Sequence, residues 1–489
     1  MNLPIHTSVS AERCFGVFVA VAFVLAAGIV CSAACGAAGG IDHGPTPKPN
    51  FILVSIDTLR ADHLTLYGYS RSTSPRLDEL AESSIVFDRA YAHSANTIVS
   101  HASMLTSLYP VSHGARPPNV ALDRSFTTLA EAFRSGGYRT AGFTAHPSWL
   151  SKKMGFAQGF DDFRARGLSA KRLNREIFDW LQSRKLQLPE TPEIPDIEEK
   201  PFFLFVHYYD VHSDWRQLPY ETRTPFDDRF VENYTGEFRG CRDGACGSEF
   251  LLRAFHDPTL LSQEELKWLV ALYDGGIAYV DHQIGSLFDQ LRELDCFDSS
   301  WIVVTSDHGE EFLEHGKVLH TQPYEETARV PFIIKPPGSR RGRLISDVVG
   351  LVDLMPTLLE AAGIDPETAA QGRSLLALIE GHDEESDYDT AVYFNELTDP
   401  GNVTIRHRNY TLVTRHDFRE LELYHHAEDP EQKNNLIDAA AADVLHSLLD
   451  KVKGFSRLQQ ELRMGRDGEV VRQSEEEIER LRSLGYVFD

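Results

Sequence analysis

The sequence is poor in positive charge. Lysine and arginine number 48 against 73 aspartate and glutamate residues, which gives a formal net charge of −25. Such a deficit argues against general binding to nucleic acid or to an anionic membrane surface, because both are strongly negative. The chain also shows no repeat array, and its 42% hydrophobic and 25% charged residues are typical of a globular protein. We therefore expect no nucleic-acid partner.

A long apolar run occurs at the N-terminus, from Cys14 to Val30, with Arg13 directly before it. This pattern is typical of a signal sequence. The run is also close to the lower length of a membrane span, so a retained membrane anchor is the alternative. We assign residues 1–40 to a signal peptide or N-terminal membrane anchor and residues 41–49 to a linker. The protein is then expected to be exported to the periplasm or cell envelope, with membrane association through the N-terminus as an open alternative.

Cysteine is scarce, and neither Cys31 nor Cys35 has the leucine expected three residues before a lipoprotein cysteine, so lipidation is not indicated. Beyond them lie Cys241, Cys246 and Cys296. In an oxidising compartment the close spacing of Cys241 and Cys246 predicts a local disulfide, with two free thiols as the alternative. A zinc site is unlikely there, because a second cysteine pair is missing.

Three short, continuous apolar runs are typical of parallel strands buried on both faces, and they cover residues 51–56, 202–206 and 301–305. Polar residues follow each run: Asp57 the first, His207 the second, and Asp307 with His308 the third. In open α/β sheets ligands bind at the carboxyl ends of the strands. The pattern therefore predicts one shared site.

Segments with helical spacing lie between these strands, at residues 77–82, 127–133 and 266–294. The alternation predicts an α/β fold with a doubly wound, mostly parallel sheet flanked by helices, and we assign it residues 50–370. Residues 371–489 are predicted to form a smaller α+β subdomain packed on the main sheet.

That subdomain is predicted from short β-like runs at 390–394 and 409–413 and from helical stretches at 438–464 and 473–484. Two stretches with little periodicity, residues 184–200 and 213–258, are expected to be surface excursions. The second of them is expected to roof the site.

Asp307, His308 and Gly309 form the strongest local signal for chemistry. An adjacent carboxylate and imidazole at a chain turn can face one cation, and glycine permits a tight turn. The alternative is an aspartate-capped turn with a surface histidine. Asp57 favours the first interpretation, because a buried carboxylate is costly unless a metal or another cation neutralises it. Two carboxylates and one imidazole suit a divalent metal.

Residues 96–107 combine a cluster of hydroxyl groups with the start of a helix of small residues. A helix N-terminus binds sulfate or phosphate through its backbone N–H groups, and a metal-activated hydroxyl such as that of Thr97 can attack such an anion. The alternative is an ordinary Ser/Thr helix cap.

Several segments, taken in order, resemble the successive motifs of the sulfatase family within the alkaline phosphatase superfamily. The clearest are DTLRAD at 57–62, SHASMLT at 100–106, PFFLFVH at 201–207 with His212 beyond it, and TSDHGE at 305–310. Further similarities lie at 324–331, 353–358 and 422–430. The similarity spans most of the chain, from about residue 50 to residue 486. It implies a metal-dependent ester hydrolase with an anionic ester substrate, such as a sulfated or phosphorylated glycan, lipid or small molecule.

The departures from this pattern are as informative. Sulfatases carry a cysteine or serine that is oxidised to formylglycine, and this chain has Thr97 there, with Val99 for the usual proline and His101 for the usual arginine. Threonine cannot yield an aldehyde by that oxidation, so no formylglycine is expected. Thr58 replaces the second aspartate of the sulfatase pair, and His308 stands where the family has asparagine or histidine.

The resulting set of Asp57, Thr97, Asp307 and His308 is similar to that of the lipoteichoic acid synthases and related phosphoglycerol transferases, which use a metal-activated threonine. The resemblance implies one divalent metal ion held by these four residues. The loss of one oxygen ligand and the presence of an imidazole favour Mn²⁺, Zn²⁺ or Mg²⁺ over Ca²⁺.

The resemblance also places His212 and His320 near the anion, where they are candidates to hold it or to protonate the leaving oxygen. His320 stands where sulfatases usually have a lysine. His146 falls near a family Lys-Trp-His motif and His101 replaces an anion-side arginine, so both are candidate substrate-binding residues, although His101 as a local helix cap is an alternative. By contrast, His207 is expected to pack or hydrogen-bond locally.

Three functions remain open from the sequence. The first is a hydrolase or transferase of sulfate or phosphate esters with Thr97 as nucleophile and a covalent enzyme intermediate. The second is a sulfatase that acts without formylglycine. The third is a non-catalytic relative that binds anionic glycans or lipids.

His315 is expected to lie on a surface loop.

Overall fold

The computed structural model describes residues 48–185, 200–213, 218–220, 222–231, 234–365, 370–382, 391–395, 403–415, 418–440, 442–463 and 470–472. The signal peptide or anchor expected at 1–40, nearly all of the linker, and the helix expected at 473–484 lie outside these residues. Among the helices within them, none is both long enough and apolar enough to cross a membrane.

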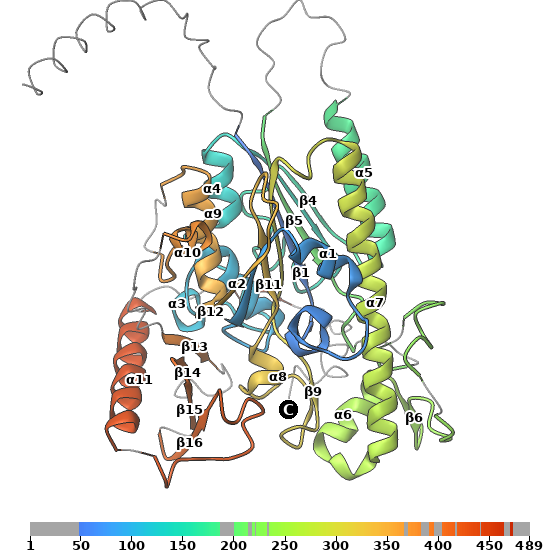
Figure 1. Cartoon of the computed structure of the whole chain (residues 1–489), viewed down its shortest axis with the longest axis vertical. Helices are drawn as coiled ribbons and strands as arrows, with labels where there is room; N and C mark the ends of the chain where they lie inside the picture. Colours follow the sequence, from blue (N-terminus) through green and yellow to red (C-terminus); the bar gives the residue numbers. More distant parts are fainter. Residues whose placement is uncertain are drawn as a thin grey trace, which may run out of the picture. The chain divides into compact units, whose positions relative to one another are not determined.

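A mixed sheet of eight strands forms the centre of the fold (Figure 1). Its spatial order is β12 (Arg343–Gly350), β2 (Ile85–Tyr91), β11 (Phe332–Lys335), β8 (Ser300–Ser306), β1 (Asn50–Ile56), β5 (Phe202–Tyr208), β3 (Arg139–Thr144) and β4 (Asp162–Ala165). Only β11 runs antiparallel to its neighbours β2 and β8, and the other pairs in this sheet are parallel. The mostly parallel sheet is thereby confirmed, and the three strands expected from the sequence are its central neighbours β8, β1 and β5.

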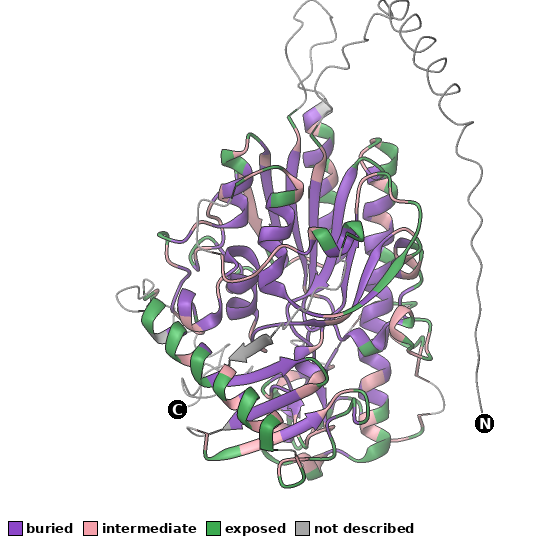
Figure 2. Ribbon diagram, turned by 60° about the vertical axis from the view of Figure 1, so that its left-hand side comes forward, coloured by how far each residue is buried: buried purple, intermediate pink, exposed green. Residues whose placement is uncertain are grey.

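Helices cover both faces of this sheet, as the doubly wound prediction requires. Successive side chains of a strand point to opposite faces, so β1 contributes Ile52 and Val54 to one core and Phe51 and Leu53 to the other. On the first face lie α1 (Pro75–Ala81), α5 (Ala170–Lys185) and the long α7 (Gln263–Glu293); on the second lie α2 (Thr97–Thr106), α4 (Leu129–Ser135) and α9 (Leu354–Ala361) (Figure 1). The inner strands β11, β8, β1, β5 and β3 are buried over nearly their whole length (Figure 2), whereas the edge strands β12 and β4 are partly exposed.

The C-terminal part carries a second, antiparallel sheet of four strands. Its elements are β13 (Ala391–Asn395), β14 (Val403–His407), β15 (Tyr410–Arg415), β16 (Glu420–His425) and α11 (Ala442–Arg463). Ile405 of β14 packs with Leu448 and Val452 of α11 in a separate small core. The smaller α+β subdomain is therefore present, while its boundary at residue 370 stays a prediction.

The excursion expected at 213–258 differs in part from the prediction. It contains the helix α6 (Ser248–His256), whose Phe250, Leu251 and Ala254 are buried in the main core. Sequence periodicity missed this helix because it is too short to show a sustained pattern. The hairpin of β6 (Cys241–Arg242) and β7 (Ala245–Cys246) precedes it, and the predicted disulfide between Cys241 and Cys246 closes this hairpin.

Candidate active site

Two carboxylates meet at the carboxyl edge of the central sheet. Asp57 follows β1 and Asp307 follows β8, and because these strands pair in parallel their ends lie side by side. The Thr58 backbone N–H donates to Asp307 Oδ1 over 3.3 Å, and Thr58 adopts the left-handed conformation with φ 56°. Asp57, Asp307 and His308 each offer a ligand atom, and these atoms lie within 4.8 Å of one another. All three residues are fully buried.

Thr97 reaches this cluster from the first turn of α2. The Asn96 side chain caps that helix and accepts hydrogen bonds from the backbone N–H groups of Ile98 and Val99. Because Asn96 supplies the cap, the Thr97 hydroxyl does not serve as one. Thr97 Oγ1 lies 3.5 Å from Asp57 Oδ2 and 3.4 Å from His308 Nε2.

The donor atoms fit a divalent cation. His308 Nδ1 lies 3.0 Å from the Gly309 carbonyl oxygen, which can only accept, so the ring proton lies on Nδ1 and Nε2 carries a lone pair. That Nε2 is 3.4 Å from Asp307 Oδ2, an oxygen that accepts no hydrogen bond from the described residues. Burial alone would raise the pKa of Asp307, but the imidazoles of His308, His101 and His207 and the Thr58 N–H hold that pKa below its ordinary value. The cluster thus concentrates negative charge where a cation would neutralise it.

His101 lies inside the protein, fully buried behind the nucleophile candidate. Its Nδ1 donates to the Thr97 carbonyl over 2.8 Å and lies 3.6 Å from Asp307 Oδ2, while its Nε2 is 2.9 Å from the Ser55 hydroxyl. Burial lowers the pKa of His101 to about 3, so the ring is neutral. Both ring nitrogens are occupied by protein groups. These contacts suit a residue that positions Thr97 and Asp307 better than one that binds substrate.

His207, which is expected to pack or hydrogen-bond locally, lies beside the proposed metal ligands. Its Nε2 lies 3.1 Å from Asp57 Oδ2, and its ring is 5.0 Å from that of His101. Residues of β5 and β1 are adjacent in register, Ser55 opposite His207, which brings the imidazole beside the neighbouring carboxylate. The expected packing and hydrogen bonding are thus present, but the partner Asp57 could not be predicted because strand pairing is not visible in the sequence.

His320 and His212 lie together at the margin of the metal-ligand cluster. The His320 ring is 4.6 Å from the His308 ring and 5.1 Å from the His212 ring, measured between centroids. His320 Nδ1 lies 2.9 Å from Glu310 Oε2, a buried carboxylate that the sequence analysis does not single out. Burial, reinforced by the neighbouring imidazoles, lowers the pKa of His212. The predicted proximity of His212 and His320 to the cluster thus agrees with the geometry, while their roles stay predictions.

His146 lies further along the same rim. Its Nδ1 accepts a hydrogen bond from the Trp149 backbone N–H over 3.0 Å, and its ring is 4.7 Å from that of Tyr209. Tyr209 in turn stacks on His212 with 4.6 Å between ring centroids. His146 is therefore linked to His308 through the rings of Tyr209, His212 and His320, and its role in substrate binding stays a prediction.

His315 lies in a turn at residues 313–317, as expected for a loop residue, but its side chain is only 11% exposed. Its ring stacks on Tyr324 with 3.6 Å between centroids, Nδ1 lies 2.6 Å from Glu326, and Nε2 lies 3.0 Å from the Gln432 carbonyl. Tyr324 and Gln432 therefore cover the ring, and such long-range packing is invisible to local sequence patterns.

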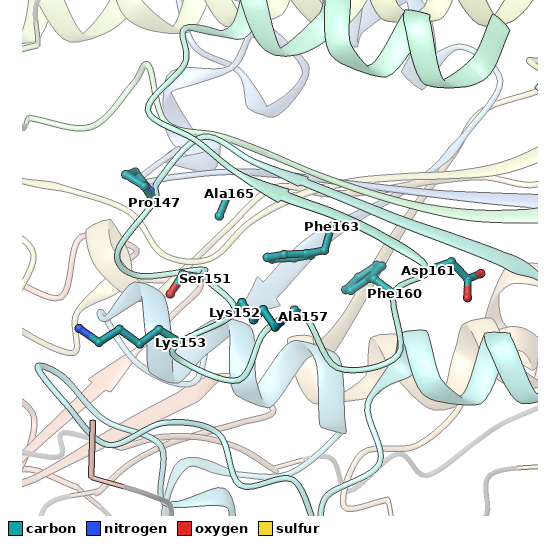
Figure 3. Close-up of a pocket in the computed structure, with 9 residues that line it drawn as sticks. All are labelled: Pro147, Ser151, Lys152, Lys153, Ala157, Phe160, Asp161, Phe163 and Ala165. Carbon is teal, nitrogen blue, oxygen red and sulfur yellow. The ribbon is translucent and has the colours of Figure 1, made fainter. Parts of the chain in front are cut away.

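A groove of 520 Å³ lies beside the open edge strand β4 and is separate from the histidine and carboxylate cluster (Figure 3). The rings of Phe160 and Phe163 lie along it with 5.5 Å between centroids, and Lys152 and Lys153 are also part of its lining. None of the eight candidate site residues lines it. The groove begins at Pro147, directly after His146.

Comparison with known proteins agrees with this geometry. The Sulfatase family model matches residues 49–364, more than half of the chain, and the model for the C-terminal region of N-sulphoglucosamine sulphohydrolase matches residues 314–458. The arylsulfatase of Clostridium perfringens (strain 13 / Type A) is 27% identical over 394 residues, which cover 68% of this chain and 79% of that protein. The N-acetylglucosamine-6-O-sulfatase of Bacteroides thetaiotaomicron is 24% identical over 476 residues, covering 81% and 84%.

A solved structure supports the fold over nearly the whole length. The phosphonate monoester hydrolase of Agrobacterium radiobacter superposes with a TM-score of 0.66 at 21% identity and covers 87% of this chain and 100% of its own. Together with the family-model match, the mixed sheet and the clustered carboxylates, this identifies the chain as a member of the sulfatase family, an ester hydrolase of the sulfatase and alkaline phosphatase superfamily.

Proposed function

We propose that this protein is a metal-dependent hydrolase of phosphate esters, preferentially diesters, with Thr97 as its nucleophile. The observation that carries the proposal is the position of the Thr97 hydroxyl, which lies within 3.5 Å of both Asp57 Oδ2 and His308 Nε2. A hydroxyl beside the ligand atoms of a metal site is placed for activation as a nucleophile.

Asp57, Asp307, His308 and the Thr97 hydroxyl would hold one divalent cation, Mn²⁺, Zn²⁺ or Mg²⁺ in preference to Ca²⁺, because imidazole is a poor ligand for calcium. When bound, such an ion lowers the pKa of a coordinated hydroxyl and withdraws charge from the ester oxygens. His101 holds the Thr97 backbone through a 2.8 Å hydrogen bond and lies 3.6 Å from Asp307 Oδ2, so it packs between the nucleophile and one ligand.

The reaction proceeds by two displacements at phosphorus. Thr97 first gives its hydroxyl proton to solvent, and Oγ1 then forms a bond to phosphorus as the bond to the leaving oxygen breaks, while the leaving alkoxide takes a proton from His320 Nε2. A water oxygen then attacks phosphorus and gives one proton to His320 Nε2 as the bond to Thr97 breaks, which restores both the Thr97 oxygen and the general acid. His212, kept neutral by burial, donates a hydrogen bond to the ester anion. An acceptor alcohol in place of water would make the same reaction a transfer.

The charge of the site supports a singly charged ester. Two ionised carboxylates, Asp57 and Asp307, balance a divalent cation, so the pair and the ion together carry no net charge. Within the described part of the chain, the contacts of Thr97, Asp307 and His308 involve no lysine or arginine. A phosphate diester with one negative charge is therefore easier to accommodate than a phosphate monoester with two.

A sulfate ester is the second candidate substrate, because it also carries one negative charge and because the two relatives compared by sequence above are sulfatases. The threonine disfavours it. A formylglycine hydrate can expel sulfate by collapsing to the aldehyde, whereas a threonine adduct needs a second attack, which phosphorus tolerates better. The organic part of the substrate is proposed to be a glycan, lipid or small molecule met in the periplasm or cell envelope.

The test compares a nitrophenyl phosphate diester with the matching nitrophenyl sulfate on metal-loaded protein. We expect the higher kcat/KM for the diester, and Thr97→Ala should lose at least about 1,000-fold of kcat with either substrate. Thr106→Ser is the matched control, because Thr106 lies on the same helix and its hydroxyl donates to the backbone carbonyl of Ala102 in that helix. A clear preference for sulfate, or full activity in Thr97→Ala, would overturn the proposal.

A further inference from the structure

Glu310 is a buried carboxylate whose two oxygens are both engaged by side chains. Tyr220 donates its hydroxyl to Glu310 Oε1 over 2.7 Å, and His320 Nδ1 lies 2.9 Å from Glu310 Oε2. The Glu310 backbone is also held, since its carbonyl accepts from Arg60 Nη1 over 3.0 Å and its N–H donates to the Glu326 carbonyl over 3.0 Å. Glu310 is thus a rigid acceptor that meets one edge of the His320 ring.

The contact fixes which nitrogen of His320 can serve the reaction. An ionised carboxylate only accepts, so the ring proton facing Glu310 lies on Nδ1. Nε2 is the ring nitrogen that does not face Glu310. As a general acid His320 carries a second proton on Nε2, which passes to the leaving oxygen while Nδ1 keeps its own. The backbone directly before His320 is strained, because Leu319 adopts the left-handed conformation with φ 73°. A leucine in that conformation indicates that the surrounding structure determines the orientation of the next residue.

The residues directly after His320 are held by Glu311 and not by Glu310. The Glu311 carboxylate accepts from the Thr321 backbone N–H over 2.7 Å and from Gln322 Nε2 over 2.7 Å. Glu310 instead contacts the imidazole alone within that segment. Of these two adjacent buried glutamates, Glu311 therefore holds the chain after His320, and Glu310 holds the His320 ring.

We propose that Glu310 is a positioning residue for the reaction, which orients the His320 imidazole through Nδ1 so that Nε2 serves the leaving-group oxygen. This inference rests on the proposed function. Glu310 does not touch the substrate and acts only through His320. Tyr220 fixes the second oxygen of the carboxylate and so restricts its rotation.

The kinetic test uses phosphate diesters that differ in leaving group, a nitrophenol that leaves without help and an alkyl alcohol that needs a proton. Glu310→Ala should lower kcat for the alkyl ester about 100-fold, in the range of general acid catalysis, and kcat for the nitrophenyl ester less than about tenfold, with little change in KM. Glu310→Gln should lie between, because its amide oxygen can still accept from Nδ1. Glu311→Gln is the matched control and should change both substrates by the same factor.

Equal losses on both substrates in Glu310→Ala, matching those of Glu311→Gln, would overturn the inference. A second measurement is independent of activity. Nitrogen-15 shifts of histidine-labelled protein, with His320 assigned from His320→Asn, should show the proton on Nδ1 in the wild type and a loss of that preference in Glu310→Ala. An unchanged tautomer would also overturn it, whereas activity retained in Thr97→Ala would count against the proposed function only.

Discussion

His207 Nε2 lies 3.1 Å from Asp57 Oδ2, a contact between two neighbouring strands at the edge where the candidate metal ligands gather. The His207 Nδ1 is buried and makes no hydrogen bond with the described residues. We therefore place the ring proton on Nε2, which donates it to Asp57. A histidine that donates to a ligating carboxylate fixes its orientation without touching the metal. His207 is therefore a supporting residue of the proposed metal site.

The first prediction follows from that contact. His207→Ala should weaken metal affinity about 10-fold to 100-fold, the usual effect of removing a partner of a ligand, while the four proposed ligands remain. Metal titration followed by calorimetry measures it. His113→Ala is the matched control, because His113 is equally buried but bonds Ser103 and Ala115. Equal affinities in the wild type and in His207→Ala would refute this role.

The second prediction concerns Asp307. Asp307→Ala should abolish stoichiometric metal and activity but leave the metal-free protein folded. Among the described residues its carboxylate accepts one hydrogen bond, over 3.3 Å from the Thr58 N–H, and burying its charge is unfavourable. Elemental analysis and thermal unfolding of purified protein provide both readouts. Asp353→Asn is the control, a buried aspartate that caps backbone N–H groups at Gly350 and Arg373. Stoichiometric metal in Asp307→Ala would exclude the assignment.

The third prediction concerns the disulfide of the β6–β7 hairpin. Cys241 and Cys246 are five positions apart, and closing so short a loop contributes about 2 kcal/mol through the entropy of the unfolded chain. Replacing both cysteines by serine should speed hydrogen exchange in the hairpin and in α6 and leave kcat unchanged. Exchange mass spectrometry measures the first effect, and a non-reduced digest shows the linked peptides in wild-type protein. Finding both wild-type thiols free would contradict it.

The fourth prediction concerns pH and stability far from the site. Burial raises the pKa of Asp281 from 3.8 to about 7, although its carboxylate accepts from the N–H groups of Arg76 and Leu77. A raised folded-state pKa means that the folded protein keeps a proton which the unfolded chain releases. The associated stability is complete below the unfolded pKa and is lost as the pH rises through the folded value.

Asp281→Asn removes this titration, so its free energy of unfolding relative to wild type should increase between pH 5 and pH 8. The increase is at most about 3 kcal/mol, because roughly two pH units separate pH 5 from the folded pKa and each is worth about 1.4 kcal/mol. Asparagine also loses one hydrogen bond. That loss lowers the free energy of unfolding equally at both pH values, so it cancels in the difference between them. Urea unfolding at the two pH values gives the difference. Asp289→Asn, an exposed position on the same helix, should show none. A pH-independent difference for Asp281→Asn would contradict the prediction.

Much of the fold could be predicted from local patterns. Strands β1, β5 and β8 are continuous apolar runs because they are buried on both faces, and the helices α1, α4 and α7 appear as apolar periodicity. The antiparallel course of β11 could not be predicted, because four residues buried on both faces look the same in either direction.

The sequence by itself determined which chemical groups this protein can use: the ordered motifs, the threonine at position 97 in place of a cysteine or serine, and aspartates directly after buried strands. Only the tertiary structure decided which of the histidines serve those groups. His101 turns inward to Ser55 and Asp307, His207 meets Asp57, and Glu310 meets His320. The His101 and His207 contacts join residues 46 to 206 positions apart, and strand order, not local sequence, sets such distances. Even the Glu310 contact, ten positions along the chain, depends on the short β9–β10 hairpin of Glu311–Phe312 and Val318–Leu319 that folds the chain back on itself.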